Sequence, residues 1–374
     1  MKAKRLFRTA SVCLILILLV TALAACTSKP ESAKTAAPTP QAPAQVITLR
    51  MATWHPAKIP AVNSGFWIIR ELERRSMGRI KVEEFYSGTL AGGKELLQAC
   101  GKGIVDACLW NPTYNPGLGP LAEIGFVPAV IGSTWSGIMA FNRCFEEFPA
   151  MEQEFTGNNV VYLSGTGNPR CNIISTKPIR SLNDLKGLKI NAGGYQQVLL
   201  SKLGVPAISI ISTEVYEALT RGTVDGNVNN PEWARVYNFH EAGKYWYDIP
   251  VGGFIFHSIM NKDFFNKLPA DLQKLLMSLR DPQAEANYMT YDVASDERAR
   301  GIMYKTLEVI KPPQGDIDQF LKIAKETVWT DWIKEIEKKG LPGQKLFDRW
   351  LYWNDYYSKQ QHPTYTGSLA DRAR

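Results

Sequence analysis

The most informative stretch of the chain reads Glu214-Val-Tyr-Glu-Ala-Leu-Thr-Arg-Gly-Thr-Val-Asp-Gly-Asn-Val-Asn-Asn-Pro231. Good helix formers with regularly spaced apolar residues favour a helix over Glu214–Arg221, with Thr213 as its N-cap and Gly222 as its stop. A short buried strand is expected at Thr223–Gly226, followed by a turn rich in amides. Amides at a strand end of an α/β protein are candidates for ligand contacts, although Asn and Gly also favour turns for their own sake.

The N-terminus predicts export. Positive residues at positions 2, 4, 5 and 8 precede an apolar run, Val12–Ala25, which is short for a membrane span and ends in Leu23-Ala-Ala-Cys26. This tetrapeptide resembles a bacterial lipobox, which implies that residues 1–25 are a lipoprotein signal peptide and that Cys26 carries the lipid. We therefore expect anchoring to the outer face of the bacterial cytoplasmic membrane, on the periplasmic side in a Gram-negative cell. The alternative is an uncleaved anchor helix.

The composition sets the size of the fold and disfavours some partners. Residues 26–45 are rich in Ser, Thr, Ala, Pro and Gln and predict a flexible tether. Residues 46–374 exceed the length at which one hydrophobic core usually keeps growing, so two lobes are expected. The formal net charge is +7, and because the signal holds four of the positive residues, the rest of the chain carries +3. This small excess, without a basic run, argues against nucleic acid as a partner.

Four cysteines remain beyond the signal and Cys26: Cys100, Cys108, Cys144 and Cys171. Their spacing fits no zinc site, because no CxxC is present and His is scarce, and we expect no metal and no cofactor. Buried free thiols and one disulfide are both compatible with an exported protein, and the sequence does not choose between them.

Strand and helix patterns alternate through the folded part, which predicts an α/β fold with a largely parallel sheet covered by helices. A second α/β lobe is expected to follow the first, and long helices are expected from Ala270 onward. Strands are predicted at Val46–Thr53, Ile80–Tyr86, Ile104–Trp110, Val160–Leu163, Asn172–Ser175 and Phe254–Met260, and helices at Asn63–Ser76 and Gly93–Gly103.

Several blocks then occur in a characteristic order. They are Ser87-Gly-Thr-Leu-Ala-Gly-Gly-Lys-Glu-Leu-Leu97, Gly103-Ile-Val-Asp106, Arg180-Ser-Leu-Asn-Asp-Leu-Lys-Gly-Leu-Lys-Ile190, Leu203-Gly-Val-Pro206, Thr213-Glu-Val-Tyr-Glu-Ala-Leu219 and Gly222-Thr-Val-Asp-Gly226. Together they resemble the substrate-binding proteins of tripartite ATP-independent periplasmic (TRAP) transporters, the DctP-like family, over about residues 47 to 340.

The resemblance implies a two-lobed, periplasmic-binding-protein-like (Venus flytrap) fold with a cleft between the lobes. Residues 46–168 and about 254–300 would form lobe 1, and residues 169–253 and about 301–374 would form lobe 2. It also implies a partner, a membrane permease pair driven by ion gradients and not by ATP, to which the receptor delivers a small organic ligand such as a carboxylate.

The resemblance also selects candidate ligand-binding residues. The family places an arginine, which suits a carboxylate, where this chain has Asn191, and a second family arginine falls near Arg170. A side-chain amide of the family matches Asn229 or Asn230. Glu232 and Trp233 follow, as in keto-acid-binding members that use a cation, which makes Glu232 a weak metal candidate beside its reading as a solvated helix start.

Two strand ends are expected to face the cleft and supply the remaining candidates, Trp54 with His55 and Trp110 with Asn111. His55 is expected to be a loop residue and no catalyst. Phe254 and Phe256 share one face of their strand, where packing is the favoured role and lining the cleft the alternative.

Three classes of function remain after this reading. A lipid-anchored solute receptor feeding a secondary transporter is favoured, and a receptor for a sensor system is the alternative. An exported enzyme is disfavoured, because the chain has no Gly-x-Ser-x-Gly, no P-loop and no His-Glu-x-x-His.

Overall fold

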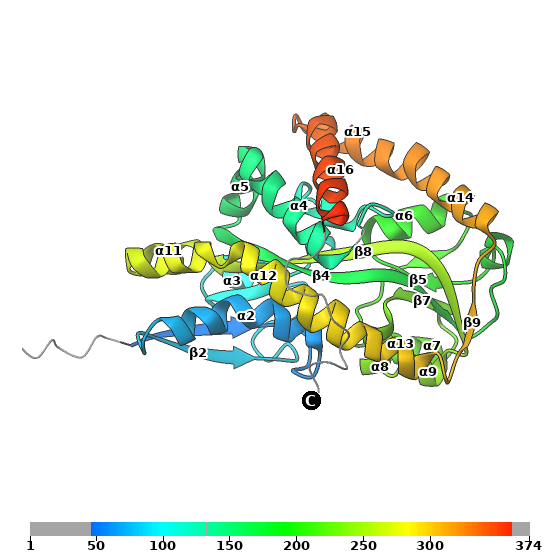
Figure 1. Ribbon diagram of the computed structural model, residues 1–374, viewed down its shortest axis with the longest axis horizontal. Helices are drawn as coiled ribbons and strands as arrows, with labels where there is room; N and C mark the ends of the chain where they lie inside the picture. Colours follow the sequence, from blue (N-terminus) through cyan, green and yellow to red (C-terminus); the bar gives the residue numbers. More distant parts are fainter. Residues whose placement is uncertain (1–45, 132, 361–374) are drawn as a thin grey trace, which may run out of the picture. The chain divides into compact units, whose positions relative to one another are not determined.

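Nine strands of the described residues form one continuous sheet in a computed structural model that describes residues 46–131 and 133–360 (Figure 1). The predicted signal peptide, Cys26 and the tether lie outside the described residues. The sheet order is β2-β1-β3-β8-β4-β7-β5-β6, with β9 beside β8. The strands are β1 (Ile47–Ala52), β2 (Ile80–Phe85), β3 (Ala107–Trp110), β4 (Val160–Ser175), β5 (Ile190–Asn191), β6 (Ala207–Ile208), β7 (Gly226–Asn229), β8 (Tyr245–Asn261) and β9 (Glu308–Ile310).

Helices cover the sheet in both lobes. They are α2 (Pro60–Arg75), α3 (Leu96–Gly101), α4 (Thr134–Glu147), α5 (Pro149–Gly157), α6 (Gly194–Lys202), α7 (Val215–Thr220), α8 (Pro231–Val236), α9 (Phe239–Ala242), α10 (Lys262–Lys267), α11 (Ala270–Ser278), α12 (Arg280–Asn287), α13 (Glu297–Met303), α14 (Gln314–Ile323), α15 (Thr330–Lys338) and α16 (Gly343–Lys359). Short 3-10 turns are η1 (Pro112–Tyr114), η2 (Ala122–Phe126) and η3 (Leu182–Leu185), and π-helical segments are η4 (Tyr288–Asp296) and η5 (Ala324–Trp329).

The fold is the expected two-lobed α/β fold. In the first lobe β1 runs parallel to β2 and β3, and in the second β5 runs parallel to β6 and β7. The two lobes are joined by β4 and β8, which pair antiparallel along most of their length and cross the middle of the molecule (Figure 1). The parallel arrangement predicted from the sequence therefore holds among β1, β2 and β3 and among β5, β6 and β7, whereas β3 meets β8 and β7 meets β4 in antiparallel pairs.

The structure corrects the prediction of two separate strands at Val160–Leu163 and Asn172–Ser175, because both belong to β4. Gly165 looks like a turn signal in the sequence, but a Cβ there would come within 3.1 Å of both Ile138 and Ile255, so glycine allows close packing instead. The register of β4 against β8 shifts between Asn168 and Cys171, next to Pro169, which has no N–H for the ladder. The predicted lobe boundary at 168/169 falls at this shift.

The stretch from Glu214 folds as α7 and then β7. Gly222 has φ +69°, so it ends the helix in the left-handed conformation that glycine adopts freely. Thr213 is not the N-cap, which is a correction: the cap is Glu214, whose N–H donates to the carbonyl of Ile211 in a preceding turn. The predicted strand is also shifted, because Asn227 and Asn229 lie within β7 and not in a turn after it.

The C-terminal helix α16 packs on the body of the protein through its aromatic face. Trp350 is fully buried and its ring lies 6.4 Å from that of Phe141, while Tyr357 lies 5.4 Å from Trp135, so α16 covers α4. The sequence assigns α16 to the second lobe, and the structure packs it against a helix of the first.

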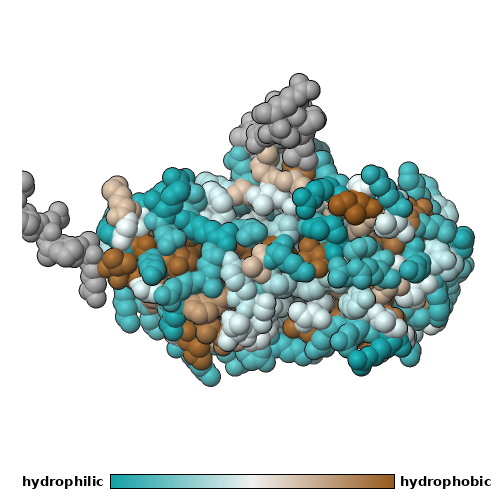
Figure 2. Space-filling view, turned by 90° about the horizontal axis from the view of Figure 1, so that it is seen from below, coloured by the Kyte–Doolittle hydropathy of each residue, from teal (hydrophilic) through white to brown (hydrophobic). Residues whose placement is uncertain are grey.

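The remaining features of the described residues are their surface, their helix lengths and their cysteine thiols. Figure 2 shows one face on which hydrophilic residues predominate and hydrophobic residues form separate patches. Within the described ranges, no helix has the length and apolar character that a bilayer crossing needs. The structure favours thiols over a disulfide, because four buried cysteines of the described residues form no disulfide: Cys100, Cys108, Cys144 and Cys171.

Candidate ligand-binding pocket

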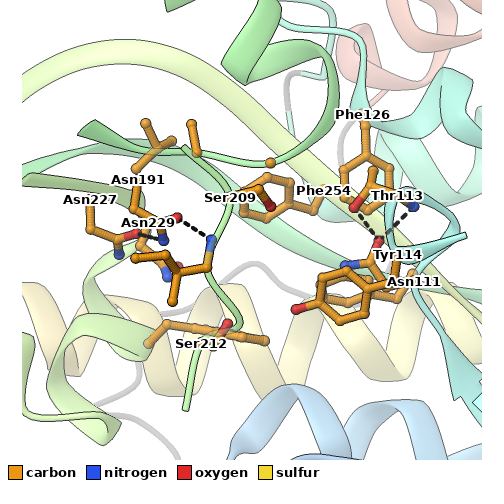
Figure 3. Close-up of a pocket in the computed structure, with 16 residues that line it drawn as sticks. Asn111, Thr113, Tyr114, Phe126, Asn191, Ser209, Ser212, Asn227, Asn229 and Phe254 are labelled. Atoms are coloured by element: carbon orange, nitrogen blue, oxygen red, sulfur yellow. Dashed lines mark hydrogen bonds between the residues drawn. The ribbon is translucent and has the colours of Figure 1, made fainter. Parts of the chain in front are cut away.

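A small pocket lies where segments of the two lobes meet, and its cavity volume is about 60 Å³ (Figure 3). From the second lobe it is lined by Asn191, Ala192, Gly193, Ser209, Ile210, Ser212, Asn227, Val228, Asn229 and Trp233. Lining residues from the first-lobe segments are Asn111, Thr113, Tyr114, Phe126, Phe254 and Phe256. The volume is well below the roughly 300 Å³ at which sites for drug-sized ligands begin, so this conformation suits a small molecule.

Three asparagines from β5 and β7, here called the amide row, form one side of the pocket. Asn227 and Asn229 alternate along β7 and therefore share a face, and Asn191 of β5 pairs with Asn227 in register. Figure 3 shows the amide row grouped opposite Phe126, Phe254 and Tyr114. Strand geometry thus brings three side-chain amides to one wall.

Backbone N–H groups fix how these amides are oriented. Oδ1 of Asn191 accepts from the N–H of Ile210 at 2.7 Å, and Oδ1 of Asn229 accepts from the N–H of Asn230 at 2.9 Å. Because a backbone N–H can only donate, the atom it meets must be the amide oxygen. Nδ2 of Asn191 then donates to Oδ1 of Asn227 at 2.7 Å, so the third oxygen is occupied as well.

The nitrogens of the amide row remain for a ligand. Nδ2 of Asn227 is buried and has no partner among the described residues, and Asn227 is only 1% exposed. Asn229 adds a further side-chain amide at the pocket wall, and Nδ2 of Asn191 has a second hydrogen to donate. Trp233 adds a buried, unpartnered Nε1–H.

An aromatic wall formed by Phe126, Phe254 and Phe256 lies opposite the amide row. The ring centroids of Phe126 and Phe254 are 5.4 Å apart, and that of Phe256 lies 5.8 Å from Phe126 and 5.9 Å from Trp233. These spacings are typical of packed aromatic pairs. Phe254 and Phe256 thus both pack and line the pocket, whereas the sequence favoured packing and left lining the cleft as the alternative.

The pocket carries no formal charge from the residues described to line it. Tyr114 stays neutral, because burial raises the pKa of its phenol to about 12 although Ser212 and Asn111 hydrogen-bond to it. Charged groups begin farther out, in an adjoining groove of about 530 Å³ that shares Thr113 and Tyr114 with the pocket and is also lined by Lys94, Glu95 and Glu214. The inner site therefore offers polar contacts and apolar surface without an ion-pairing partner.

Comparison with known proteins identifies the family. The family described as bacterial extracellular solute-binding protein, family 7 (DctP), matches residues 68–336. The chain belongs to this family. The resemblance seen in the sequence is thereby confirmed, and this DctP chain is a solute-binding protein.

Relatives and solved structures agree along the whole folded part. A monocarboxylate 2-oxoacid-binding periplasmic protein of Nostoc sp. is 24% identical over 370 residues, or 94% of this chain and 93% of the relative. A TRAP periplasmic solute-binding protein from Desulfovibrio salexigens matches with TM-score 0.73 and 26% identity over 86% of this chain and 99% of its own. One from Rhodoferax ferrireducens, in complex with copurified benzoate, matches with TM-score 0.77 and 21% identity over 84% and 99%.

Four of the predicted ligand-binding residues line the pocket of this DctP protein: Asn111, Asn191, Asn229 and Trp233. Asn111 is less available than the amide row, since its Oδ1 accepts from both the N–H and the hydroxyl of Thr113. The positions of these residues agree with the prediction, and their contact with a ligand stays a prediction.

Trp54 and His55 lie behind the lining residues and not among them. Trp54 packs edge-on against Tyr114 and Phe256, with ring centroids 5.5 and 5.9 Å away. His55 is buried, and its Nδ1 lies 2.8 Å from the hydroxyl of Tyr237. Burial lowers the pKa of His55 to about 3, so the imidazole is neutral and supports the lining residues from behind.

The other predicted residues have partners of their own. Asn230 caps α8, with Oδ1 accepting from the N–H of Trp233 at 3.0 Å and from the hydroxyl of Tyr291 at 2.8 Å. Nε1 of Trp110 donates to Oδ1 of Asn115 at 3.1 Å. The guanidinium of Arg170 is about half exposed and lies 3.5 Å from the carboxylate of Asp248.

Glu232 is fully buried, which corrects the reading of a solvated helix start. Both of its carboxylate oxygens accept from Arg235, at 2.8 and 2.6 Å. Among the described residues no group of three His, Cys, Asp or Glu side chains could hold a metal ion. The carboxylate of Glu232 is therefore committed to an ion pair in α8.

Sequence reasoning missed several lining residues. Asn227 could have been found, because it precedes Asn229 by two residues and a strand places both on one face. Thr113, Tyr114 and Phe126 carry no such signal, since they come from 3-10 turns whose positions depend on how the lobes pack.

Proposed function

We propose that this chain is the extracytoplasmic receptor of a TRAP transporter and that it captures a small organic acid in the pocket. The observation that carries the proposal is the pocket itself, in which the amide row faces the aromatic wall across the junction of the lobes in a DctP fold. Donors on one side and apolar rings on the other suit a compact molecule with one polar end.

The ligands named for similar proteins support an organic acid. The Nostoc relative is named for monocarboxylate 2-oxoacids, and the Rhodoferax structure holds benzoate. Both names describe ligands with a single carboxylate. The pocket of this chain lacks the arginine that the family places at position 191, so other groups would have to hold an acid.

Binding is proposed to close the lobes. A ligand that touches Asn227 in one lobe and Phe126 in the other gains more contacts when the lobes approach, and this differential affinity shifts the population toward the closed state. The register shift at Asn168–Cys171 in β4, opposite the glycine pair Gly252 and Gly253 of β8, is the proposed hinge. The predicted lobe boundaries, 46–168 with about 254–300 and 169–253 with about 301–374, are part of this proposal.

The closed receptor would then dock on a membrane permease pair that takes up the ligand. We also propose that the chain is exported through the signal in residues 1–25 and held at the membrane by a lipid on Cys26. No catalytic step is proposed for this receptor.

A binding panel on the purified mature protein tests the proposal. Native mass spectrometry and thermal shift with keto acids, aromatic acids, sugar acids, amino acids and neutral solutes should show one class bound at a 1:1 ratio and released unchanged. At a ligand concentration of about 100 Kd the free energy of unfolding should rise by roughly 2.7 kcal/mol. Chemical conversion of the bound compound would overturn the receptor assignment.

Uptake assays separate transport from sensing. Vesicles that contain a TRAP permease pair should accumulate the ligand only when the receptor and an ion gradient are both present. Ligand-dependent activation of a sensor kinase, without uptake, would favour the sensor alternative.

A further inference from the structure

We infer that the amide row binds its ligand through donors alone, so that the ligand end placed there carries only acceptors, as a carboxylate does, and is held without an arginine. This inference rests on the proposed function and specifies how the site chooses its ligand. It starts from the three amide oxygens, every one of which already accepts a hydrogen bond inside the protein.

The orientation of the amide row follows from one chain of contacts. The N–H of Ile210 fixes Asn191, and Asn191 in turn fixes Asn227. Rotating either amide by 180° would place two donors or two acceptors face to face, which removes a hydrogen bond and leaves a buried group unpaired. Each oxygen is thus turned toward a protein donor and has one of its two lone pairs in use, whereas the nitrogens present free N–H groups to the ligand.

The unpaired donors themselves point to a ligand. Nδ2 of Asn227 and Nε1 of Trp233 are buried without a partner among the described residues, although such groups usually find one. A buried donor left unsatisfied destabilises the free protein, and a ligand oxygen would remove that cost. Their place on the pocket wall distinguishes these two donors from buried indole N–H groups elsewhere, such as that of Trp246, which also lack a partner among the described residues.

A carboxylate fits this arrangement better than other polar groups. An ionised carboxylate only accepts, at about four lone-pair positions, whereas a primary amide brings two N–H donors and an ammonium brings three. Hydrogen bonds to an ionised acceptor are roughly twice as strong as neutral ones, which offsets part of the cost of leaving water. Two or three N–H donors suffice to hold a carboxylate in its ionised form.

The opposite wall restricts the rest of the ligand. Phe126, Phe254 and Phe256 offer only apolar surface, and the residues described to line the pocket provide no cation for a second acid group. The inferred ligand is therefore a small monocarboxylate with an apolar body.

Matched ligands test the inference on the unaltered mature protein. Isothermal titration should be run with three acid and primary amide pairs, benzoate with benzamide, pyruvate with pyruvamide and lactate with lactamide, and with benzylamine. The acid of at least one pair should bind at least about tenfold more tightly than its amide, because the amide turns donors toward donors. Benzylamine should not bind.

This design distinguishes failure of the inference from failure of the proposed function. If an amide or the amine binds as tightly as the acids, the inference is overturned while the receptor function stands. If no compound of the pairs or of the wider panel binds, the proposed function fails and takes the inference with it.

An exchange of one donor for an acceptor gives a second test. Asn227→Asp keeps the shape of the side chain and replaces its free N–H group with an oxygen, so affinity for the preferred acid should fall by about 100-fold or more. The same variant should now bind benzylamine. Unchanged acid affinity in Asn227→Asp would overturn the inference.

Asn354→Asp is the matched control for folding. Asn354 is a buried amide of α16 outside the pocket, and its Nδ2 donates to the carbonyl of Trp350. This variant measures what a buried Asn-to-Asp change costs in unfolding free energy, and it should keep the acid affinity of the unaltered protein. If Asn227→Asp fails to fold, the acid and amide pairs still test the inference on the unaltered protein.

Discussion

Asn191 of β5 and Asn227 of β7 are paired across neighbouring parallel strands, and Nδ2 of Asn191 donates to Oδ1 of Asn227 over 2.7 Å. This contact determines which end of the Asn227 amide is free. In the proposed binding mode, the residue at the place of the family's arginine acts on the ligand partly through its neighbour.

The substitution Asn191→Asp should therefore reverse the neighbouring amide. An aspartate oxygen in place of Nδ2 would attract the N–H group of Asn227 and leave the oxygen of Asn227 for the ligand. We expect affinity for the preferred acid to fall by roughly tenfold or more, since a donor is lost and an acceptor gained. Isothermal titration measures this, and an unaltered affinity would contradict the role given to Asn191.

Arg170 tests the carboxylate anchor expected from the sequence against the N–H donors proposed for the pocket. Its guanidinium lies near Asp248 and is not among the pocket-lining groups. Arg170→Ala should change acid affinity by less than about twofold, because exposed ion pairs contribute little. Arg180→Ala, which removes an exposed arginine 3.3 Å from Glu308, is the control. A loss of more than tenfold in Arg170→Ala alone would return Arg170 to the site.

The indole nitrogen of Trp233 can be removed without removing most of the ring. Trp233→Phe deletes the unpaired Nε1–H and keeps apolar contact with Phe256, so acid affinity should drop about five- to tenfold while stability is kept. Trp246→Phe is matched, because Trp246 is also buried with an unpartnered Nε1 but lies outside the pocket. Titration of both variants should show a loss only for Trp233→Phe, and equal affinities would exclude a contact to Nε1.

Glu123 of η2 predicts a pH dependence of stability. Burial, with the nearby carboxylates of Glu335 and Glu154, raises the pKa of Glu123 to about 8. The folded pKa lies above the unfolded one, so the stabilising contribution is complete below about pH 4.5 and is lost as pH rises through about 8. Glu123→Gln cannot ionise and should be the more stable protein at pH 8, by on the order of 1 kcal/mol after allowance for its partial exposure.

Urea unfolding at pH 5, 6.5 and 8 measures the effect of Glu123→Gln. The difference from the unaltered protein should grow with pH. Glu152→Gln, at an exposed position of α5, is the control and should show no such trend. Parallel stability curves for Glu123→Gln and the unaltered protein would refute the assignment.

Lipid attachment is tested at the N-terminus. Cys26→Ser should move the protein from the membrane fraction to the soluble fraction, because the acyl chains that would hold it are missing. Cys13→Ser lies within the predicted signal and should leave the fractionation unchanged. Mass spectrometry of the N-terminal peptide of the unaltered protein should show an acylated cysteine, and a membrane-bound Cys26→Ser protein would point to an uncleaved helix.

Local signals allowed the sequence to predict much of the fold. The end of α7 at Gly222 follows from one residue with φ +69°, which is a property of glycine itself. The merging of two predicted strands into β4 does not follow, because Gly165 serves packing against Ile138 and Ile255 that only the folded protein reveals.

The candidate site, like the fold, could be predicted from the sequence only in part. The amides of β5 and β7 could be predicted from the sequence, since strand alternation and family order place Asn191 and Asn229 at the cleft. The aromatic wall could not be predicted, because Phe126 reaches the pocket from a 3-10 turn that lies more than sixty residues from Asn191 in sequence. Trp54 shows the converse error: it lies at the predicted strand end, but Tyr114 and Phe256 pack between it and the cavity.

The pairing of β3 with β8 has a consequence for how the protein is made. Ala107 of β3 pairs with Met260 of β8, so the sheet of the first lobe cannot be completed until the chain has been synthesised past residue 260. Until then β3 is an open edge, which other chains could join. On the proposed export route, a factor that holds the chain unfolded until residue 260 has been made would keep this edge from pairing with other chains.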